Sequence, residues 1–233
     1  MIHEGRVTLN GHKVEQPGVK IGRRDIVAVD GNVVSPAANN TYILYNKPRG
    51  LLCSRKDIRG RPLIYDHLDI PANVQSIGRL DMDSEGLLLL TDNGALAQAL
   101  IHPGANIPRQ YRVRITSQLT DESLEALRNG GIDMGRGDIS DPWQVSVDSE
   151  SRGHSWISVT IYRGRWREVR RTLAALGHEV RRLMRIRFGP IKLDMEMRTG
   201  AWRNLTASEL KQLKAITSRS GQAGKSDPAN NSE

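Results

Sequence analysis

The sequence contains one cysteine, Cys53, and few aromatic side chains, which make up 4% of its 233 residues. A single cysteine cannot build an internal disulfide framework, which excludes the disulfide-stapled secreted domains. Long hydrophobic runs are missing too: Leu87–Leu90 is far shorter than the roughly 20 apolar residues that cross a bilayer. The first residues lack the basic and then apolar order of a signal peptide. We therefore expect a cytoplasmic protein with no membrane segment.

Metal-binding patterns are missing as well, whereas positive charge is abundant. The histidines are scattered, and none lies at zinc-ligand spacing from Cys53, so we expect no metal site. Lysine and arginine number 34 against 26 acidic residues, which gives a net charge of +8. In a cytoplasmic protein this balance favours nucleic acid as the partner. A basic surface that only keeps a protein soluble has the same composition, so the arrangement of the charges must decide.

The chain divides into three segments. Residues 1–38 have the pattern of short strands broken by turns, with strong turn signals at Asn10-Gly11 and Asp30-Gly31. A segment of this length cannot hold a self-sufficient core, so we expect an accessory module. The linker SPAANN leads into a long domain, 41–214, and the small, polar tail 215–233 is expected to be disordered.

Within the long domain, strand patterns outnumber helix patterns. Alternating residues predict strands over TYILYNKP, 110–117 and 155–162. Three other segments carry residues typical of helix ends: Thr120, Gly177, and the capping-box pair Thr206 and Glu209. Strands with helices inserted between them predict an α+β fold around a mostly antiparallel sheet.

The stretch GRLDMDSEGLLLLTDNG (78–94) carries the most distinctive pattern. Counted from Asp81, its acidic side chains and glycine lie close to the positions of a calcium-binding loop. The ninth position would be Leu89, however, and the twelfth Asp92, whose carboxylate reaches a metal less well than that of glutamate. A calcium loop also needs a helix on both sides, whereas the residues after Glu85 resemble a buried strand. The calcium-binding alternative is therefore weak.

The same stretch can instead present Asp81 at the mouth of a buried strand. Arg79 and Leu80 precede it and an apolar run follows, so its carboxylate is expected to be held rigidly, as catalysis requires. A single positioned carboxylate can attack the anomeric carbon of a sugar or stabilise positive charge there. Asp83 fits a solvated acidic turn.

Several linked motifs resemble one enzyme family. The stretch around Asp81 resembles the catalytic motif of RNA pseudouridine synthases, in the RsuA/RluB branch that acts on ribosomal RNA. Four further segments resemble motifs of this branch in the same order: NKPRGLLCSRKDIRGRP (46–62), LAQALIHPGANIPRQYRV (96–113), YRGRWREVRRTLAALGHEVRRLMRIRFGPIKL (162–193) and GAWRNLTASEL. The EVRR sequence that begins at Glu168 favours the large-subunit RluB type. Residues 1–38 resemble the strand-bearing half of the S4 RNA-binding domain, without its helical half.

The resemblance implies roles for individual residues. Asp81 would be the essential carboxylate, and Arg170 the basic residue that pairs with it. Tyr111 would stack on the target base and Leu183 would line its pocket, while Arg79 is predicted to contact the substrate. A charge-stabilised carboxylate and an aromatic face suit a base that has been pulled out of its stack. On pattern alone, the favoured interpretation is that Tyr111 is an ordinary strand residue and Leu183 an ordinary core residue.

Arginines are concentrated between Arg163 and Arg187, interleaved with Tyr162 and Trp166. A solvated basic face is the usual explanation of such a run. Arginines mixed with aromatic residues downstream of a catalytic motif favour phosphate contacts instead. We predict RNA contacts from four basic side chains: Lys47, Arg165, Arg167 and Arg171.

The patterns and the resemblance together predict an rRNA pseudouridine synthase. Its α+β fold would be a curved, mostly antiparallel sheet flanked by helices, with a small partial S4-like appendage. The implied reaction breaks the N-glycosidic bond of a uridine, turns the base and rejoins it through carbon, with no cofactor. The expected partner is ribosomal RNA or a ribosomal assembly intermediate, bound by a monomer. The main alternative is a non-catalytic RNA-binding or ribosome-assembly module, which shares RNA affinity but lacks the chemistry of Asp81.

Overall fold

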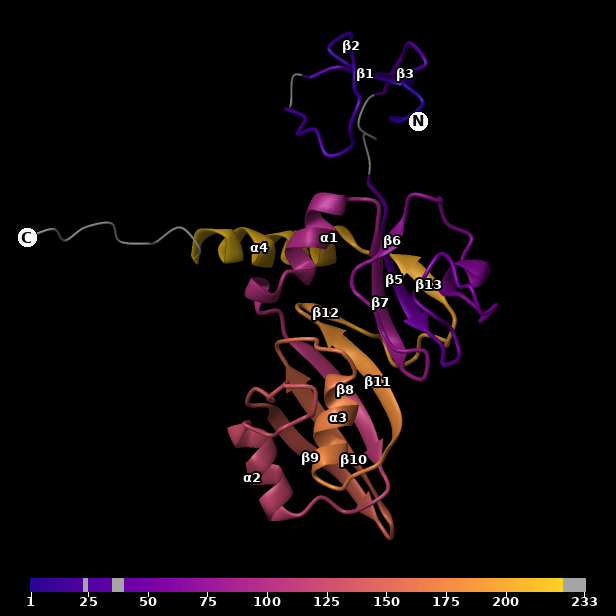
Figure 1. Cartoon of the computed structure of the whole chain (residues 1–233). Coiled ribbons are helices and arrows are strands. Elements are labelled where there is room, and N and C mark those ends of the chain that lie inside the picture. Colours follow the sequence, from indigo (N-terminus) through magenta and orange to yellow (C-terminus); the bar gives the residue numbers. More distant parts are fainter. Residues whose placement is uncertain (23–24, 35–39, 224–233) are drawn as a thin grey trace, which may run out of the picture. The chain divides into compact units, whose positions relative to one another are not determined.

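The computed structural model describes residues 1–22, 25–34 and 40–223, and its contacts divide the chain into two units, Met1–Asn40 and Thr41–Glu233 (Figure 1). Most of the expected linker and the last ten residues of the expected tail, 224–233, lie outside the described residues.

The start of the expected tail is helical, so the prediction of disorder from residue 215 onward is wrong for 215–223. Helix α4 runs over Ala207–Ala223. It begins at a capping box, in which the Thr206 amide donates to Glu209 Oε2 at 2.8 Å and the Glu209 amide donates to Thr206 Oγ1 at 3.2 Å. The capping box and the burial of Leu213 stabilise the start of the helix, which continues into a polar segment despite the low helix propensity of Gly221.

The first unit is a small antiparallel sheet with the strand order β2-β1-β3-β4. Its strands are β1 (Val7–Leu9), β2 (His12–Lys13), β3 (Val27–Val29) and β4 (Asn32–Val34). The two predicted turns have positive φ at both central residues, for example 51° at Asn10 and 82° at Gly11, which matches the twist of a tight hairpin. No described residue of this unit is buried, in keeping with a segment too short for a core of its own.

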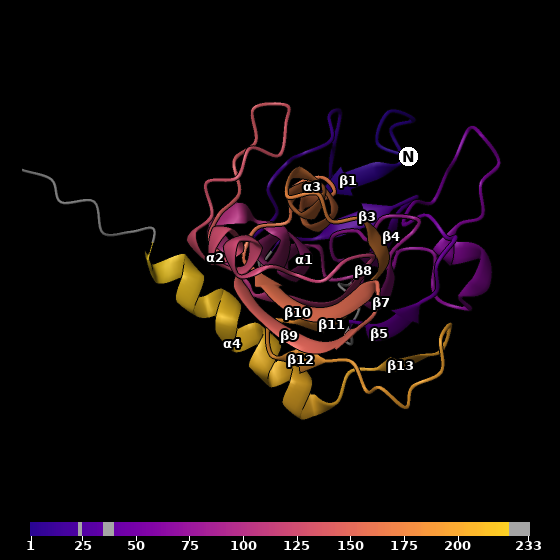
Figure 2. The same cartoon turned by 90° about the horizontal axis from the view of Figure 1, so that it is seen from below.

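The second unit is built on one long, curved sheet with the strand order β13-β5-β7-β11-β8-β10-β9 (Figure 2). Its strands are β5 (Tyr42–Lys47), β6 (Gln75–Ser76), β7 (Glu85–Thr91), β8 (Arg109–Ile115), β9 (Gln144–Ser151), β10 (His154–Ile161), β11 (Val180–Phe188), β12 (Ile191–Lys192) and β13 (Trp202–Asn204). The pairing of β7 with β11 is parallel, and the other pairings between the named strands of this sheet are antiparallel. The predicted curved, mostly antiparallel sheet is confirmed.

Helices cover both faces of this sheet, with α3 and α4 on opposite sides (Figure 2). They are α1 (Gly94–Ile101), α2 (Asp121–Asn129), α3 (Glu168–Ala175) and α4, together with short turns η1 (Ile64–His67) and η2 (Pro103–Ala105). Thr120 caps α2, because its side chain accepts a hydrogen bond from the Ser123 amide. No helix in the described part of the chain is long and apolar enough to cross a membrane.

The core has two parts, one on each face of the sheet. Alternation along β7 assigns its leucines to the two parts in turn. Leu88 and Leu90 belong to the part that includes residues of α3, whereas Leu87 and Leu89 belong to the part that includes residues of α1 and α4. A strand buried on both faces shows the unbroken apolar run seen in the sequence.

The parallel pairing of β7 with β11 forms a seam between two halves of the domain. Glu85 pairs with Met184, and Gly86 with Arg185. Gly86 has a φ of +98°, and a Cβ at this position would collide with the backbone of Arg185, so the close approach of the two strands requires glycine. One half of the sheet then holds β13, β5 and β7, and the other holds β11, β8, β10 and β9.

Candidate active site

Asp81 lies in the turn that leads into β7, at the seam between the two halves of the sheet. The Ser84 amide donates to the Asp81 carbonyl at 3.0 Å, which closes the turn. From the neighbouring segment, the Gly50 amide donates to the Met82 carbonyl at 2.7 Å. The thiol of Cys53 lies beside Leu80, within 3.4 Å of its carbonyl oxygen. The backbone that carries Asp81 is therefore fixed from several directions.

Lys47 is the internal clamp of this turn rather than an RNA contact. Its side chain is completely buried, and its ammonium donates to the carbonyls of Pro48 at 2.9 Å, Asp81 at 3.3 Å and Ser84 at 2.9 Å. Burial lowers the pKa of the Lys47 ammonium, and the nearby carboxylates counteract this. The prediction that Lys47 binds RNA is wrong, because all three donors of its ammonium point into the protein.

Two cavities meet at Asp81. The strand-side cavity has a volume of about 570 Å³ and is lined from the sheet by Tyr111, Leu183 and Arg185. The loop-side cavity has a volume of about 710 Å³ and is lined by the segment from Arg49 to Arg61. Five residues line both: Arg79, Leu80, Asp81, Trp166 and Arg167. The carboxylate is thus accessible from either side.

The cation closest to Asp81 is Arg167. Its Nη1 atom lies 3.6 Å from Oδ2 of Asp81, and the same guanidinium donates to both carboxylate oxygens of Asp83, at 3.1 and 3.2 Å. Arg167 precedes α3 with a φ of 49°, a left-handed conformation that side chains other than glycine rarely adopt. This backbone directs its side chain toward the catalytic turn rather than along the helix.

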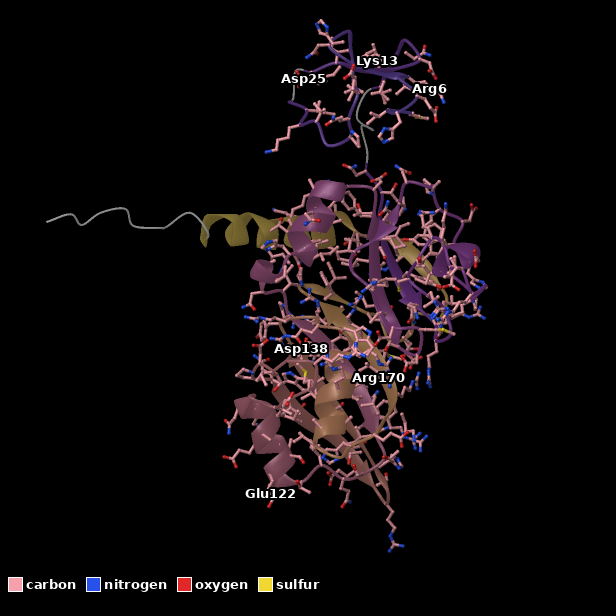
Figure 3. All side chains as sticks on the ribbon, in the orientation of Figure 1. Arg6, Lys13, Asp25, Glu122, Asp138 and Arg170 are labelled. Atoms are coloured by element: carbon pink, nitrogen blue, oxygen red, sulfur yellow. The ribbon has the colours of Figure 1, made fainter. Side chains whose placement is uncertain are left out.

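Arg170, which the family resemblance pairs with the catalytic carboxylate, contacts Asp83 instead. Its Nε atom lies 3.2 Å from Oδ2 of Asp83, and its Nη2 atom donates to the Asp83 carbonyl at 3.0 Å. Figure 3 shows Arg170 near the middle of the domain. The direct ion pair predicted between Arg170 and Asp81 is therefore replaced by one from Arg167. Asp83, expected to be a solvated turn residue, connects two arginines to the turn.

Asp81 is held between opposing electrostatic effects. Burial raises the pKa of its carboxyl group, since desolvation disfavours the charged form. The positive charge of Arg167 lowers that pKa, and the negative charge of Asp83 raises it again. As a result, the pKa of the Asp81 carboxyl group lies above its ordinary value. The Asp81 side chain is 28% exposed.

The strand-side cavity brings together most of the predicted substrate contacts. Tyr111 lies on β8 and Leu183 on β11, and both are buried against the cavity wall. Arg79 is exposed at the rim and makes no hydrogen bond or ion pair with other described residues. An aromatic ring, an apolar wall and one unpaired cation around a carboxylate suit a planar, polar ring such as a nucleobase.

Two strand arginines that line the same cavity, Arg109 on β8 and Arg185 on β11, were absent from the predicted site residues. Arg109 donates to the carbonyls of Ile107 at 3.0 Å and Tyr162 at 2.7 Å, and burial lowers its pKa. Arg185 is 2% exposed and donates to the Leu87 carbonyl at 2.7 Å. The strand period of two was the missed signal, because each lies two residues from a predicted contact, Tyr111 or Leu183, and so shares its face.

The other two predicted RNA contacts are bound to acidic partners within the domain. Arg165 lies 3.0 Å from Asp141 and 3.2 Å from Glu168. Arg171 lies 2.7 Å from Asp138 and donates to the Met134 carbonyl at 2.9 Å, with only 12% of its side chain exposed. Their roles in RNA binding stay predictions. To contact a phosphate, each would have to share its guanidinium with its present partner or leave that partner.

The calcium-binding alternative does not fit the geometry. The residues after the turn form the buried strand β7, not the helix that a calcium loop requires. Glu85, one of the would-be ligands, forms an ion pair with Arg182. In residues 1–22, 25–34 and 40–223, no group of three His, Cys, Asp or Glu side chains could hold a metal ion.

Comparison with known proteins connects this geometry to one family. Residues 41–175 match the family model described as RNA pseudouridylate synthase. The chain is 38% identical, over 90% of its length, to "Ribosomal large subunit pseudouridine synthase B" of Pseudomonas aeruginosa, but spans only 55% of that relative. It is 36% identical to the protein of the same name from Bacillus subtilis, over 93% of this chain and 88% of the relative. A solved structure described as a pseudouridylate synthase has a TM-score of 0.70 and 30% identity, covering 91% of this chain and 90% of its own.

Proposed function

The chain belongs to the RNA pseudouridylate synthase family, and we propose that it converts one uridine of large-subunit ribosomal RNA to pseudouridine through the carboxylate of Asp81. The observation that carries the proposal is the position of Asp81. It lies on a clamped turn, paired with Arg167, where two cavities meet. That arrangement supplies a fixed, partly desolvated carboxylate beside a space with an aromatic wall.

Two observations support ribosomal RNA of the large subunit as the substrate. The relatives from Pseudomonas aeruginosa and Bacillus subtilis carry that subunit in their names. The net charge of +8 suits a long polyanion, whose phosphates dominate affinity in protein–nucleic acid complexes.

The strand-side cavity suits a uracil that has left its stack. Its volume of about 570 Å³ lies within the range of ordinary small-ligand sites and leaves room for a single ring to turn. Tyr111 offers the ring a stacking face, and Leu183 an apolar wall. Arg79 at the rim is free to hold a phosphate next to the target.

The reaction requires no atom beyond those of the nucleotide and water. The bond between C1′ and N1 of the uridine breaks, and Asp81 either bonds to C1′ or stabilises its positive charge. The base turns, C5 forms the new bond to C1′, and the carboxylate is released unchanged. C5 then loses its proton to solvent, and N1 gains one. Arg167 keeps Asp81 ionised for this role despite its burial.

Pseudouridine mapping tests the proposal. Total ribosomal RNA from cells with and without the protein should differ at one uridine of the large subunit. Purified protein should restore the modification at that uridine in the RNA from the deleted strain. Identical maps, together with no conversion of the unmodified RNA in vitro, would overturn the proposal.

A further inference from the structure

The proposed reaction places the target uracil in the strand-side cavity and gives the loop-side cavity no role. It is the larger of the two, about 710 against 570 Å³, and a single uracil needs only one of them. The two cavities lie side by side and share Asp81 and four other lining residues. A strand whose target base enters one cavity would therefore bring the adjacent nucleotide near the mouth of the other.

Trp166 is the aromatic residue that lines the loop-side cavity, and it also borders the strand-side cavity. It is 52% exposed, although a large aromatic side chain normally buries most of its surface. The ring is nevertheless held in place: the guanidinium of Arg136 lies 4.3 Å from its centre and that of Arg171 lies 5.4 Å away. The Trp166 carbonyl also accepts a hydrogen bond from Arg171 at 3.1 Å. The part of the indole surface that these guanidinium groups leave exposed is available for stacking.

Unpaired cations line the same cavity as this ring. Arg61 is held by Asp57 at 2.6 Å, and Arg167 by Asp83 at 3.1 Å. The remaining basic side chains of the cavity are Arg49, Lys56 and Arg79, which are exposed and make no ion pair with described residues. Positive charge without a partner, next to an aromatic surface, is complementary to a nucleotide rather than to a neutral ligand.

We propose that the loop-side cavity is a second nucleotide subsite, in which the base next to the target uridine stacks on Trp166 while its phosphate contacts the unpaired cations at the rim. This subsite rests on the proposed function, because its occupant is the neighbour of the reacting nucleotide. It adds affinity without touching the reacting atoms. Stacking of this kind tolerates any base, so the subsite selects for an unstacked neighbour rather than for a sequence.

Substitution of the indole separates this role from catalysis. Trp166→Ala should raise KM for the ribosomal RNA transcript by about tenfold and change kcat little, because one stacked base is lost from ground state and transition state alike. Trp166→Phe should restore most of the affinity. Trp202→Ala is the matched control, since Trp202 is 39% exposed on β13 and does not line the cavity. An unchanged KM in Trp166→Ala would overturn the subsite.

An abasic nucleotide beside the mapped uridine tests the contact directly. It should weaken binding to the wild-type protein by the factor that Trp166→Ala costs, and should weaken binding to that variant no further. Equal losses in both proteins would mean that the missing base never met Trp166, and the proposal would be wrong.

Fluorescence distinguishes failure of the subsite from failure of the proposed function, because it needs no turnover. Titration with a short single-stranded oligouridylate should quench the indole emission of the wild-type protein and of Trp202→Phe. Trp166→Phe should lose most of that quenching. A wild-type protein that makes no pseudouridine would overturn the proposed function alone, whereas equal quenching in all three proteins would overturn the subsite alone.

Discussion

The guanidinium of Arg167 lies 3.6 Å from the carboxylate of Asp81 and 3.1 Å from that of Asp83, so one cation is shared by two carboxylates. Arg167 belongs to the segment before α3, beyond the seam, whereas both acids belong to the turn that begins β7. The charge state of Asp81 therefore depends on contacts between the two halves of the sheet.

Replacement of the carboxylate tests its part in the chemistry. Asp81→Asn keeps the size of the side chain but removes the charged oxygen, so kcat should fall by about a thousandfold or more. RNA affinity should stay within a few-fold of wild type, as measured by filter binding. Asp148→Asn is a suitable control, because Asp148 lies on β9 and contacts Arg112 at 3.7 Å. Activity of the Asp81 variant within about tenfold of wild type would favour the non-catalytic alternative.

The pH dependence of the reaction should report the raised pKa of Asp81. The ionised carboxylate is the active form, so kcat/KM should fall as the pH drops through a value above the ordinary 3.8. Arg167→Gln removes the charge that lowers this pKa, so the inflection should move to higher pH. Arg114→Gln, on the exposed face of β8, should leave it in place. If the inflection of kcat/KM in Arg167→Gln lies at the wild-type pH or at a lower pH, the ion pair is contradicted.

Loss of the buried clamp should affect stability rather than the electrostatics of RNA binding. Lys47→Met leaves the carbonyls of Asp81, Ser84 and Pro48 without their shared donor. Each unpaired buried group costs about 1–3 kcal/mol, so the free energy of unfolding measured with urea should fall by at least about 2 kcal/mol. The salt dependence of RNA affinity should be unchanged. A flatter dependence with normal stability would restore Lys47 as a phosphate contact.

The salt dependence of RNA affinity should separate free from engaged arginines. Arg79→Gln should reduce the slope of log affinity against log salt by about 0.7–0.9, the value for one lost phosphate contact. Arg171→Gln should leave the slope unchanged and lower the free energy of unfolding by about 1–3 kcal/mol, because Arg171 links α3 to Asp138 and Met134. A reduced slope in Arg171→Gln, with an unchanged free energy of unfolding, would mean that Arg171 leaves those partners to bind RNA.

Removal of the first unit tests the expected division of the chain. The site residues all lie in the second unit, which has its own core, so deletion of residues 1–40 should leave a folded enzyme. The deletion should raise KM for a long ribosomal RNA with little change in kcat, since the contacts it removes stabilise the ground state and the transition state equally. Loss of kcat in a protein that still folds would place part of the active site in the first unit.

Local patterns predicted the elements better than the contacts between them. Thr120, Thr206 and Glu209 act within their own helices, so their sequence signals are sufficient. Tyr111 and Leu183 were predicted at the cavity through the family resemblance, and alternation along β8 and β11 keeps them on one face.

Contacts set by the tertiary structure could not be predicted in the same way. Arg167 was predicted as an RNA contact, but it lies just before α3 in a left-handed conformation, and its guanidinium lies beside Asp81. Lys47 has the sequence context of a strand end beside a loop, where a lysine is usually solvated. Its burial follows from carbonyls that arrive from the distant turn at Asp81.

The seam between β7 and β11 also bears on how the active site comes into being during folding. The two strands are separated by β8, β9, β10 and three helices, so their pairing closes one of the longest loops of the domain. Such closures carry a high entropy cost and form late, after hairpins such as β9–β10. The more local pairings, β5 with β7, β8 with β10 and β10 with β9, are then in place before Asp81 meets Arg167, whereas β13 pairs with β5 across a still longer loop. A chain arrested just short of the seam would show much of its secondary structure by circular dichroism and have no catalytic pair, so activity is acquired late in folding.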